Sequence, residues 1–357
     1  MKHHPLVIPF FLTHEGCPHR CVFCNQNAMD QNRGARLNPD DIRPQVERFL
    51  NFRGKRDRVE IAFYGGNFLG IDMVRIVSLL EASSRLVDEG IVDGIRFSTR
   101  PDTVRDELLY LLRKYPISTV EIGVQSLNDN ALRRSMRGHS AETTYHAVER
   151  LKAHGSRFGV QLMIGLPGDT EAESFKTAEI VSSFSPDFIR IYPTVVLKGS
   201  LLATWYAEGR YHPLPLDQCV SHIKQLYLFF RGRNIPVIRM GLQASETLSA
   251  GKDLLAGPFH PAFGHLVLSE IAFDQIVSQA RRKNCKFGKL SIMVHPDNIS
   301  RVKGIRSQNV KKLQTLLGLT IVDIISDPSC PGDRLVIDGI PVFLDPCHDK
   351  IPADGLK

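Results

Sequence analysis

The sequence lacks the features that mark several classes of protein. None of its apolar runs approaches the length of a membrane-spanning helix, and Met1-Lys2-His3-His4-Pro5 leads directly into a strand-like run without the pattern of a signal peptide. It contains no low-complexity tract and no internal repeat beyond alternating strands and helices. Seven cysteines, three of them clustered, do not form the pattern of a secreted disulfide framework. These absences predict a cytoplasmic protein in a reducing environment, with no membrane partner.

The length and the charge distribution describe what is present. A chain of 357 residues can form one barrel-sized domain and a small second module. The net charge is +7, but residues 281–312 hold ten Lys or Arg against a single acid, Asp297, which gives +9, so the remaining chain sums to −2. This asymmetry indicates a contact with a polyanion, and the alternative is a solvated helical face.

Short apolar runs alternate with amphipathic stretches from residue 6 to about residue 240, the pattern of repeated βα units. Polar residues follow most of these strands, where barrels place their sites, so we expect an α/β fold with a complete or partial TIM-type barrel. A doubly wound sheet is the alternative. The predicted strands are Leu6–Leu12, Val59–Tyr64, Ile95–Thr99, Thr119–Val124, Val160–Ile164 and Phe188–Tyr192, with a seventh candidate at Pro236–Met240.

The second half of the chain predicts a separate small α+β domain. We expect the barrel domain over residues 1–245, a turn-rich junction over 246–262, the α+β module over 263–345 and a loose tail over 346–357. The module begins with a helix over Phe263–Arg282. Its other predicted elements are strand Leu290–Val294, a short helical segment, helix Gln308–Leu317 and strands Ile321–Ile325 and Arg334–Ile337.

Three cysteines, Cys17, Cys21 and Cys24, lie within eight residues in a C-x3-C-x2-C spacing, in a loop after the first predicted strand. Such a loop can direct three thiolates toward one centre, and thiolates hold iron–sulfur clusters. A four-iron cluster with three protein ligands leaves one iron open to a ligand that is not protein. The alternative is a zinc site completed by His14 or His19.

With Phe23 before the last cysteine, this spacing resembles the signature of the radical S-adenosylmethionine (radical SAM) superfamily. The resemblance implies a 4Fe–4S cluster whose open iron chelates SAM, and a reductant such as a flavodoxin or ferredoxin. It also implies cleavage of SAM to a 5′-deoxyadenosyl radical. Gly65-Gly66-Asn67 after the second strand resembles the superfamily's glycine motif, which contacts the methionine amino group. Asn67 stands where a glutamate is common. The alternative for the glycine pair is a tight turn.

Gln125 after the fourth strand and Arg137 in Met136-Arg137-Gly138 resemble SAM-holding residues of two groups, the oxygen-independent coproporphyrinogen oxidases and the radical SAM subunit of Elongator. A guanidinium suits the SAM carboxylate because the two pair through parallel hydrogen bonds. Gln161, on the fifth strand, stands where the coproporphyrinogen group has a ribose-binding acid. The alternative for all three is an ordinary polar residue at a barrel mouth.

The Elongator resemblance runs from about residue 6 to 245 and includes Thr99-Arg100-Pro101-Asp102 and Ile191-Tyr192-Pro193-Thr194. It differs in its compact cysteine spacing and in the absence of a following acetyltransferase domain. It therefore implies radical chemistry, with RNA or tRNA as substrate, and no acetyl transfer. Two other hypotheses remain: a small-molecule, porphyrin-type radical SAM oxidoreductase with an apolar pocket, and a non-catalytic RNA-binding iron–sulfur protein.

In the predicted α+β module, Val302-Lys303-Gly304-Ile305-Arg306-Ser307 joins two helices between two strands, which resembles the minimal KH core. In KH domains a Gly-x-x-Gly turn at this place clamps a nucleic-acid backbone. Ser307 replaces the second glycine. The predicted RNA contacts are Lys303, Gly304, Arg306, Lys311 and Lys312. A packing module is the alternative. His260 between two prolines is predicted to be structural, and Cys219, Cys285, Cys330 and Cys347 have no spacing partners.

Overall fold

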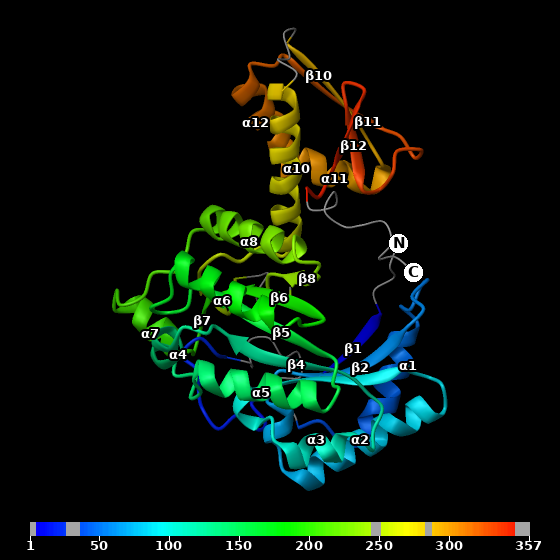
Figure 1. Ribbon diagram of the computed structural model, residues 1–357, viewed down its shortest axis with the longest axis vertical. Coiled ribbons are helices and arrows are strands. Elements are labelled where there is room, and N and C mark those ends of the chain that lie inside the picture. Colours follow the sequence, from blue (N-terminus) through cyan, green and yellow to red (C-terminus); the bar gives the residue numbers. More distant parts are fainter. Residues whose placement is uncertain (1–4, 26–35, 244–250, 283–287, 347–357) are drawn as a thin grey trace. The chain divides into compact units, whose positions relative to one another are not determined.

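The computed structural model describes residues 5–25, 36–243, 251–282 and 288–346 (Figure 1). The chain forms two compact units. The first comprises the described residues of Met1–Pro215 and Leu242–Phe259, and the second those of Leu216–Gly241 and His260–Lys357. No helix within the described ranges has the length and apolar character needed to cross a membrane.

The first unit is built on parallel strands that follow one another in the sheet in chain order. Each strand pairs with the next in parallel, so every connection is a crossover. This arrangement confirms the α/β fold and the partial barrel. The strands are β1 (Leu6–Phe11), β2 (Val59–Tyr64), β3 (Gly94–Thr99), β4 (Ile117–Gln125), β5 (Phe158–Ile164) and β6 (Phe188–Pro193).

Helices connect these strands, and Figure 1 shows α2, α3 and α5 along the outer side of the sheet. Side chains cap their starts: that of Asp72 accepts from the backbone N–H of Arg75, and that of Thr170 from the backbone N–H of Glu173. Asn38 caps a 3-10 turn, Pro39–Asp41, that precedes the first helix. The helices are α1 (Ile42–Leu50), α2 (Met73–Asp88), α3 (Asp106–Leu112), α4 (Asp129–Arg134), α5 (Ala141–Ala153), α6 (Glu171–Ser183) and α7 (Leu201–Ala207).

The alternation of side chains along β2 separates an apolar face from a polar one. Phe63 is fully buried and stacks on Phe68, with ring centroids 5.1 Å apart, and Phe68 stacks on Phe97 at 4.6 Å. Successive residues of a strand point to opposite faces, so Glu60 and Tyr64 point to the other side of the sheet from Phe63. The interior of the partial barrel therefore receives polar side chains.

Two short strands were not predicted. β7 (Val196–Leu197) pairs antiparallel with β9 (Leu254–Ala256), which lies within the predicted junction. Val195 and Leu197 form a small apolar cluster with residues around β9, Leu254 and Phe259 among them. A run of two or three residues carries too little alternation to signal a strand, so only this packing defines the pair.

The second unit contains a four-stranded sheet in the order β11-β10-β12-β13, with β10 and β11 parallel and the other pairs antiparallel. Its core joins α10 to the strands through Ile276, Leu290, Val302 and Leu313, all fully buried. The elements are α8 (Leu216–Arg231), β8 (Val237–Met240), α10 (Phe263–Arg282), β10 (Lys289–Val294), α11 (Ile299–Lys303), α12 (Gln308–Leu317), β11 (Ile321–Ser326), β12 (Arg334–Ile337) and β13 (Ile340–Phe343).

The strand β13 was not predicted, although the sequence carries a signal for it. Asp338 and Gly339, between β12 and β13, have φ angles of 45° and 82°, as a two-residue hairpin turn requires. The compact units also divide the chain differently from the predicted domains. Residues 216–241, predicted as barrel, group with the second unit, and residues 251–259 of the predicted junction group with the first. Most of the predicted loose tail lies outside the described residues.

Candidate active site

The cysteine loop follows β1 and is held by backbone hydrogen bonds to two other parts of the first unit and by one within the loop. The N–H of Val22 donates to the carbonyl of Ser135 at 3.1 Å, and the carbonyl of Val22 accepts from Leu202 at 2.8 Å. The N–H of Cys24 donates to the carbonyl of Cys21 at 3.0 Å, which forms a tight turn between these two cysteines. Cys21 is buried, whereas Cys17 and Cys24 are partly exposed.

Glycines allow the cysteine loop and the loop after β2 to touch through their backbones. A Cβ atom on Gly66 would lie 2.3 Å from the carbonyl oxygen of Leu12 and 2.5 Å from that of Glu15. A Cβ on Gly16 would lie 2.3 Å from the carbonyl oxygen of Asn67. Gly65 has a φ of 88°, in the region that favours glycine. The Gly65-Gly66 pair therefore shapes the site through close packing.

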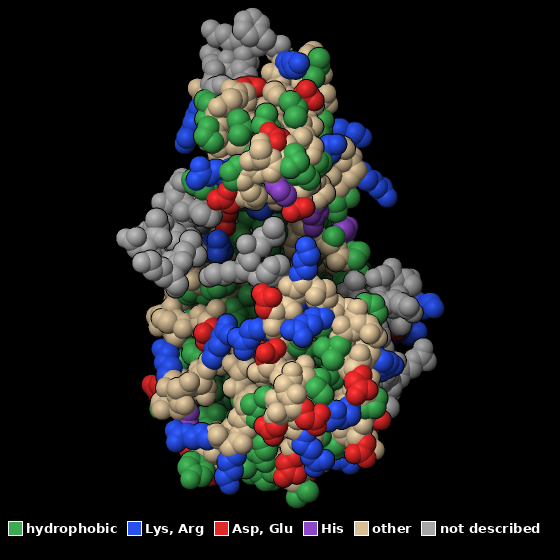
Figure 2. Space-filling model, turned by 90° about the vertical axis from the view of Figure 1, so that its right-hand side faces the viewer, with side chains coloured by type: hydrophobic (Ala, Val, Ile, Leu, Met, Phe, Trp, Pro, Cys, Tyr) green, Lys and Arg blue, Asp and Glu red, His purple; other side chains and the backbone are tan. Residues whose placement is uncertain are grey.

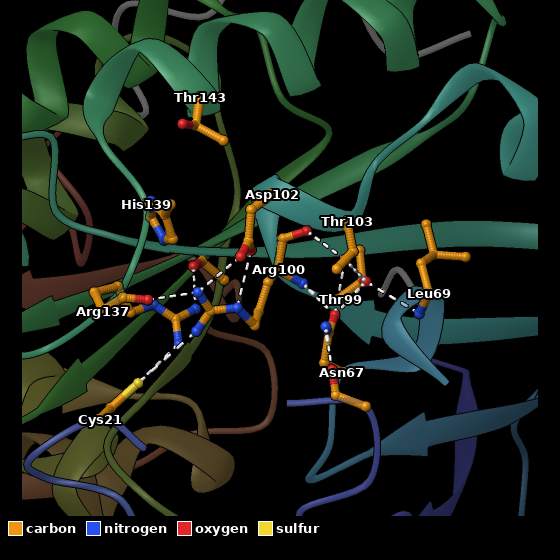
Figure 3. Close-up of polar contacts among 12 residues, drawn as sticks. Cys21, Asn67, Leu69, Thr99, Arg100, Asp102, Thr103, Arg137, His139 and Thr143 are labelled. Atoms are coloured by element: carbon orange, nitrogen blue, oxygen red, sulfur yellow. Dashed lines mark hydrogen bonds and ion pairs between the residues drawn. The ribbon is translucent and has the colours of Figure 1, made fainter. Parts of the chain in front are cut away.

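The side chain of Asn67 is fully buried and joins three loops (Figure 3). Its Nδ2 donates to the carbonyl of Gly16 at 2.7 Å. Its Oδ1 accepts from the Thr99 hydroxyl at 2.8 Å, the Arg100 N–H at 2.9 Å and the Thr103 hydroxyl at 2.9 Å. These bonds occupy the amide, so the structure gives Asn67 a role in ordering the loops. Its predicted contact with SAM stays a prediction.

Two buried arginines approach the thiol of Cys21 (Figure 3). Arg137 donates to its Sγ at 3.3 Å, and Arg100 reaches the same atom at 4.0 Å. Asp102 fixes Arg100 through two hydrogen bonds, of 2.9 and 3.0 Å, and Arg100 also donates to the carbonyl of Arg137. A bidentate carboxylate restricts a guanidinium to one orientation. Both positive charges are therefore held beside the cysteine loop.

Arg100 and Asp102 were not predicted as site residues, although they belong to the Thr99-Arg100-Pro101-Asp102 motif. The sequence shows a strand end followed by a charged pair, which is common on protein surfaces. Arg100 is 3% exposed, however, so its charge faces the interior of the unit. Only the tertiary structure could show this orientation.

Two of the residues predicted to hold SAM each have a buried polar atom with no hydrogen-bond partner in the described part of the chain. Arg137 donates from Nη2 to the carbonyl of Gly123 at 2.6 Å, but no described residue accepts from its Nε. The Oε1 of Gln125 is likewise buried without a donor among the described residues. Both side chains extend over Gly123, where a Cβ atom would lie 2.9 Å from each. A buried donor beside a buried acceptor suits the carboxylate and amino groups of SAM, and these contacts stay a prediction.

The charges around the cysteines fit a negatively charged cluster. Burial raises the pKa of the Cys17 thiol, and the positive charges of Arg100 and Arg137 act in the opposite direction. Within the described ranges, no three Cys, His, Asp or Glu side chains converge as the ligands of a single metal ion would. The cysteines of a four-iron cluster bind different irons, so this finding and the cluster are compatible.

Phe23 and Gln161 lie in different surroundings. Phe23 packs against the apolar cluster of Val22, Val196, Leu202 and Tyr211, which supports the cysteine loop. The side chain of Gln161 lies inside the partial barrel and donates from Nε2 to Glu121 at 3.1 Å. The structure therefore places Gln161 in the polar interior of the barrel. Contacts of Phe23 and Gln161 with SAM remain predictions.

The predicted RNA contacts lie in the second unit, at the turn between α11 and α12. Gly304, Arg306 and Ser307 have φ angles of 69°, 51° and 58°, so all three are in the left-handed region. The predicted order of strand, helix, turn, helix and strand is present as β10, α11, α12 and β11. Lys303, Arg306 and Lys311 are exposed.

Two of the basic residues in the +9 stretch are engaged within the second unit. Lys312 pairs with Glu270 of α10 at 2.6 Å and lies 5.5 Å from the ring centre of Phe273. Arg301 is largely buried and donates to the carbonyl of Leu268 at 3.1 Å. On the face drawn in Figure 2, Lys and Arg side chains occur at several places on this unit. The positive charge that is free at the surface near the turn is therefore smaller than the net +9 counted from the sequence of residues 281–312. Residues 283–287 of the stretch lie outside the described residues.

Comparisons with known proteins identify the family. The profile of the radical SAM superfamily matches residues 11–180, and that of the radical SAM C-terminal domain matches residues 186–272. The two models together match most of the chain, which belongs to the radical SAM superfamily. Its cofactors are those of the superfamily, a 4Fe–4S cluster and SAM.

The similar proteins include tRNA-modifying enzymes. The chain is 25% identical to the tRNA uridine(34) acetyltransferase of Dehalococcoides mccartyi over 246 residues, which covers 59% of this chain and 54% of that protein. It is 30% identical to Elongator complex protein 3 of Saccharomyces cerevisiae over 213 residues, or 54% of this chain and 38% of that protein. The chain thus spans about half or less of the length of these relatives.

A solved structure shares the fold. The Elp3 of Methanocaldococcus infernus superimposes with a TM-score of 0.58 at 20% identity, covering 80% of this chain and 64% of that one. At this identity the likeness concerns the fold. It agrees with the parallel, partial-barrel sheet of the first unit.

Proposed function

We propose that Cys17, Cys21 and Cys24 hold the 4Fe–4S cluster and that the enzyme modifies RNA, with tRNA as the favoured class. When bound, the cluster and SAM supply a 5′-deoxyadenosyl radical, which abstracts hydrogen from the substrate. A reductant such as a flavodoxin or ferredoxin provides the electron. The observation that carries the assignment of the site is the pair of buried atoms Arg137 Nε and Gln125 Oε1, on side chains that lie together over Gly123, with Arg137 also in contact with Cys21.

The protein's own residues bind and orient in this proposal. Arg137 offers its Nε–H to the SAM carboxylate while its Nη groups stay on Gly123 and Cys21. Gln125 offers its Oε1 to the amino group. Arg100, locked by Asp102, keeps a second positive charge near the thiolates. Because Arg100 and Arg137 are buried, little water competes for these bonds, which strengthens them.

The choice of RNA rests on the second unit and on the named relatives. Lys303, Arg306 and Lys311 expose three positive charges around a turn whose backbone order matches the minimal KH core. Two of the similar proteins carry tRNA uridine 34 or Elongator in their names. A basic turn in the same chain as a radical-forming domain suits a substrate with a phosphate backbone.

The small-molecule hypothesis predicts an apolar pocket, and the interior of the partial barrel does not favour it. Tyr64, Glu121, Gln161 and Arg190 meet there in a network of hydrogen bonds and ion pairs. This network lines the interior with charged and polar groups rather than with the apolar surface that a macrocycle would need. A polar substrate group suits this interior better.

The proposal is tested with anaerobically reconstituted, chemically reduced protein. We expect 5′-deoxyadenosine to form slowly with SAM alone and faster when total tRNA is added. A filter-binding titration of the same tRNA at low salt should show binding that weakens steeply as salt rises. If tRNA does not accelerate SAM cleavage and does not bind to the protein, the small-molecule hypothesis is favoured. A loaded four-iron cluster with no SAM cleavage would favour the non-catalytic hypothesis.

A further inference from the structure

A fully buried carboxylate, Glu121 in the middle of β4, organises the interior of the partial barrel. It accepts from the Tyr64 hydroxyl at 2.8 Å and from Gln161 Nε2 at 3.1 Å. It pairs with Arg190 at 2.9 Å and with Arg96 at 3.3 Å. These four partners come from β2, β5, β6 and β3, so one carboxylate connects five strands.

The network extends to a second buried carboxylate. Arg96 also pairs with Glu60 at 2.7 Å, and the more exposed Arg58 reaches Glu60 at 3.6 Å. Burial and the neighbouring Glu121 charge raise the pKa of Tyr64 well above its usual range, so its hydroxyl stays a donor. Two guanidiniums contact the Glu121 carboxyl, and it accepts from Tyr64 and Gln161 as well. An ionised carboxylate only accepts hydrogen bonds.

This constraint decides the orientation of Gln161. An amide has a donating and an accepting end, and only the donating end can face an ionised carboxylate. Nε2 of Gln161 is therefore directed at Glu121, and Oε1 is directed away from it. Among the described residues none donates to this oxygen, and the side chain is only partly buried. Position 161 thus presents an acceptor to whatever occupies the barrel.

The same geometry explains why an amide rather than an acid stands at this position. A carboxylate at 161 would lie about as close to Glu121 as Nε2 does, at 3.1 Å. Like charges at such a separation cannot both stay ionised, and one carboxyl would take up a proton. It would also add a third carboxylate to the network. An amide held by its nitrogen offers an accepting oxygen without that charge.

We propose that Glu121 is a positioning residue: it locks the amide of Gln161 with its oxygen toward the ligand, and it excludes a carboxylate from position 161. The ligand group is a hydroxyl or another hydrogen-bond donor, and in the proposed enzyme it belongs to the ribose of SAM. The inference rests on that SAM contact. It adds that two residues on neighbouring strands form one functional unit, in which one acid faces one amide.

The test compares Gln161→Glu, Glu121→Gln and the exchange Glu121→Gln/Gln161→Glu, which keeps both the charge and one donor–acceptor pair. The control is Gln225→Glu, which adds the same charge at an exposed position of α8. SAM binding is measured by anaerobic equilibrium dialysis. Thermal unfolding is followed between about pH 5 and about pH 8.

We expect Gln161→Glu to weaken SAM binding about tenfold near pH 8, because the accepting oxygen is displaced by repulsion and rearrangement. The pKa of the coupled carboxyl is raised in the folded state, so its destabilisation is present above that pKa and is relieved as pH falls. The melting temperature of this variant should therefore approach that of the wild type toward pH 5. The exchange variant should recover most of the binding, whereas Glu121→Gln alone should not strengthen it.

Two outcomes separate this inference from the function on which it rests. If the wild-type protein binds no SAM, the proposed site fails. If the wild type binds SAM but Gln161→Glu binds it equally well and shows no pH dependence beyond that of Gln225→Glu, only the inference is overturned. An exchange variant as impaired as Gln161→Glu would likewise contradict the coupling of the two positions.

Discussion

The two candidate sites of this protein are built in opposite ways. Around Cys21 the polar groups are buried: Asn67, Arg100 and Arg137 are each less than one-tenth exposed and hold one another in place. At the turn between α11 and α12 the polar groups are exposed. Arg306 and Ser307 adopt a left-handed backbone conformation there, which residues other than glycine disfavour.

The difference matches the chemistry proposed for each site. A cofactor that generates a radical needs fixed charges and little water, which only a buried network provides. A phosphate backbone needs accessible positive charge and no deep pocket. Substitutions should therefore affect folding and cofactor binding in the first site, and polyanion binding with little effect on folding in the second.

The largest effect is expected from the cysteines. Wild-type protein reconstituted without oxygen should bind about four irons and four sulfides per chain. Replacing Cys17, Cys21 and Cys24 together by alanine should abolish the visible absorbance of the cluster, measured with iron and sulfide content. Cys330→Ala, in the second unit, is the control and should keep the iron. Iron retained in the triple variant, or zinc bound in its place, would contradict the assignment.

The contrast in burial is tested by two arginine substitutions. Arg100→Ala removes one partner of a buried ion pair and should lower the free energy of unfolding by about 3 kcal/mol. Arg306→Ala removes an equally charged but exposed side chain and should change it by no more than about 0.5 kcal/mol. Urea unfolding of both variants gives the comparison. Similar values for the two would mean that the first site is no more preorganised than the second.

Within the first site, Arg137 should matter more to SAM than Gln161. Arg137→Ala removes a charge-assisted bond to the carboxylate, which contributes roughly 1.5–3 kcal/mol, whereas Gln161→Ala removes neutral bonds of roughly 0.5–1.5 kcal/mol. The dissociation constant of SAM for each anaerobic, cluster-loaded variant measures the difference. Equal losses would show that the carboxylate lies elsewhere.

In the second site, the exposed charges should govern the salt dependence of RNA binding. Substituting Lys303, Arg306 and Lys311 together by alanine should reduce the slope of log K against log salt by up to about 0.9 for each phosphate that is no longer neutralised. Lys312→Ala is the matched control: its ammonium is held by Glu270, so a smaller change is expected. If the triple substitution leaves the slope of log K against log salt unchanged, this turn is excluded as the RNA-binding surface.

The smallest effect concerns backbone strain. Ser307 has φ of 58° and ψ of 30°, a left-handed conformation that costs a non-glycine residue about 1 kcal/mol. Ser307→Gly should raise the free energy of unfolding by up to that amount and should maintain or strengthen RNA binding, since the missing side chain allows closer approach. Ala at the same position is the control and should bring no such gain.

Much of the fold could be predicted because its signals are local. The bounds of β2, α10, α12 and β12 agree with the prediction, since each has a clear apolar pattern between turn or capping residues. The pair β7–β9 escaped prediction because its strands are too short to show a pattern. The boundary between the two units was not predicted, because residues 216–241 resemble one more βα repeat in sequence although they group with the second unit.

The candidate site divides in the same way. The cysteine spacing, the Gly65-Gly66 pair and the residues Gln125 and Arg137 could be named from sequence, because spacing within a loop or at a strand end is a local property. Glu121 and Arg100 could not, because a charged residue within a predicted strand or turn gives no sign that it is buried. Their importance depends on partners that lie far away in the sequence.

The sequence by itself determined the superfamily and the order of the strands and helices, since short-range patterns of thiols, glycines and apolar residues carry that information. Only the tertiary structure decided which charges are buried and which way each polar group points. Asn67 became a link between loops, Lys312 a partner of Glu270, and Gln161 an acceptor held by Glu121. The physical reason is that a hydrogen bond or ion pair depends on the distance and orientation of two groups, and packing of the whole unit sets both.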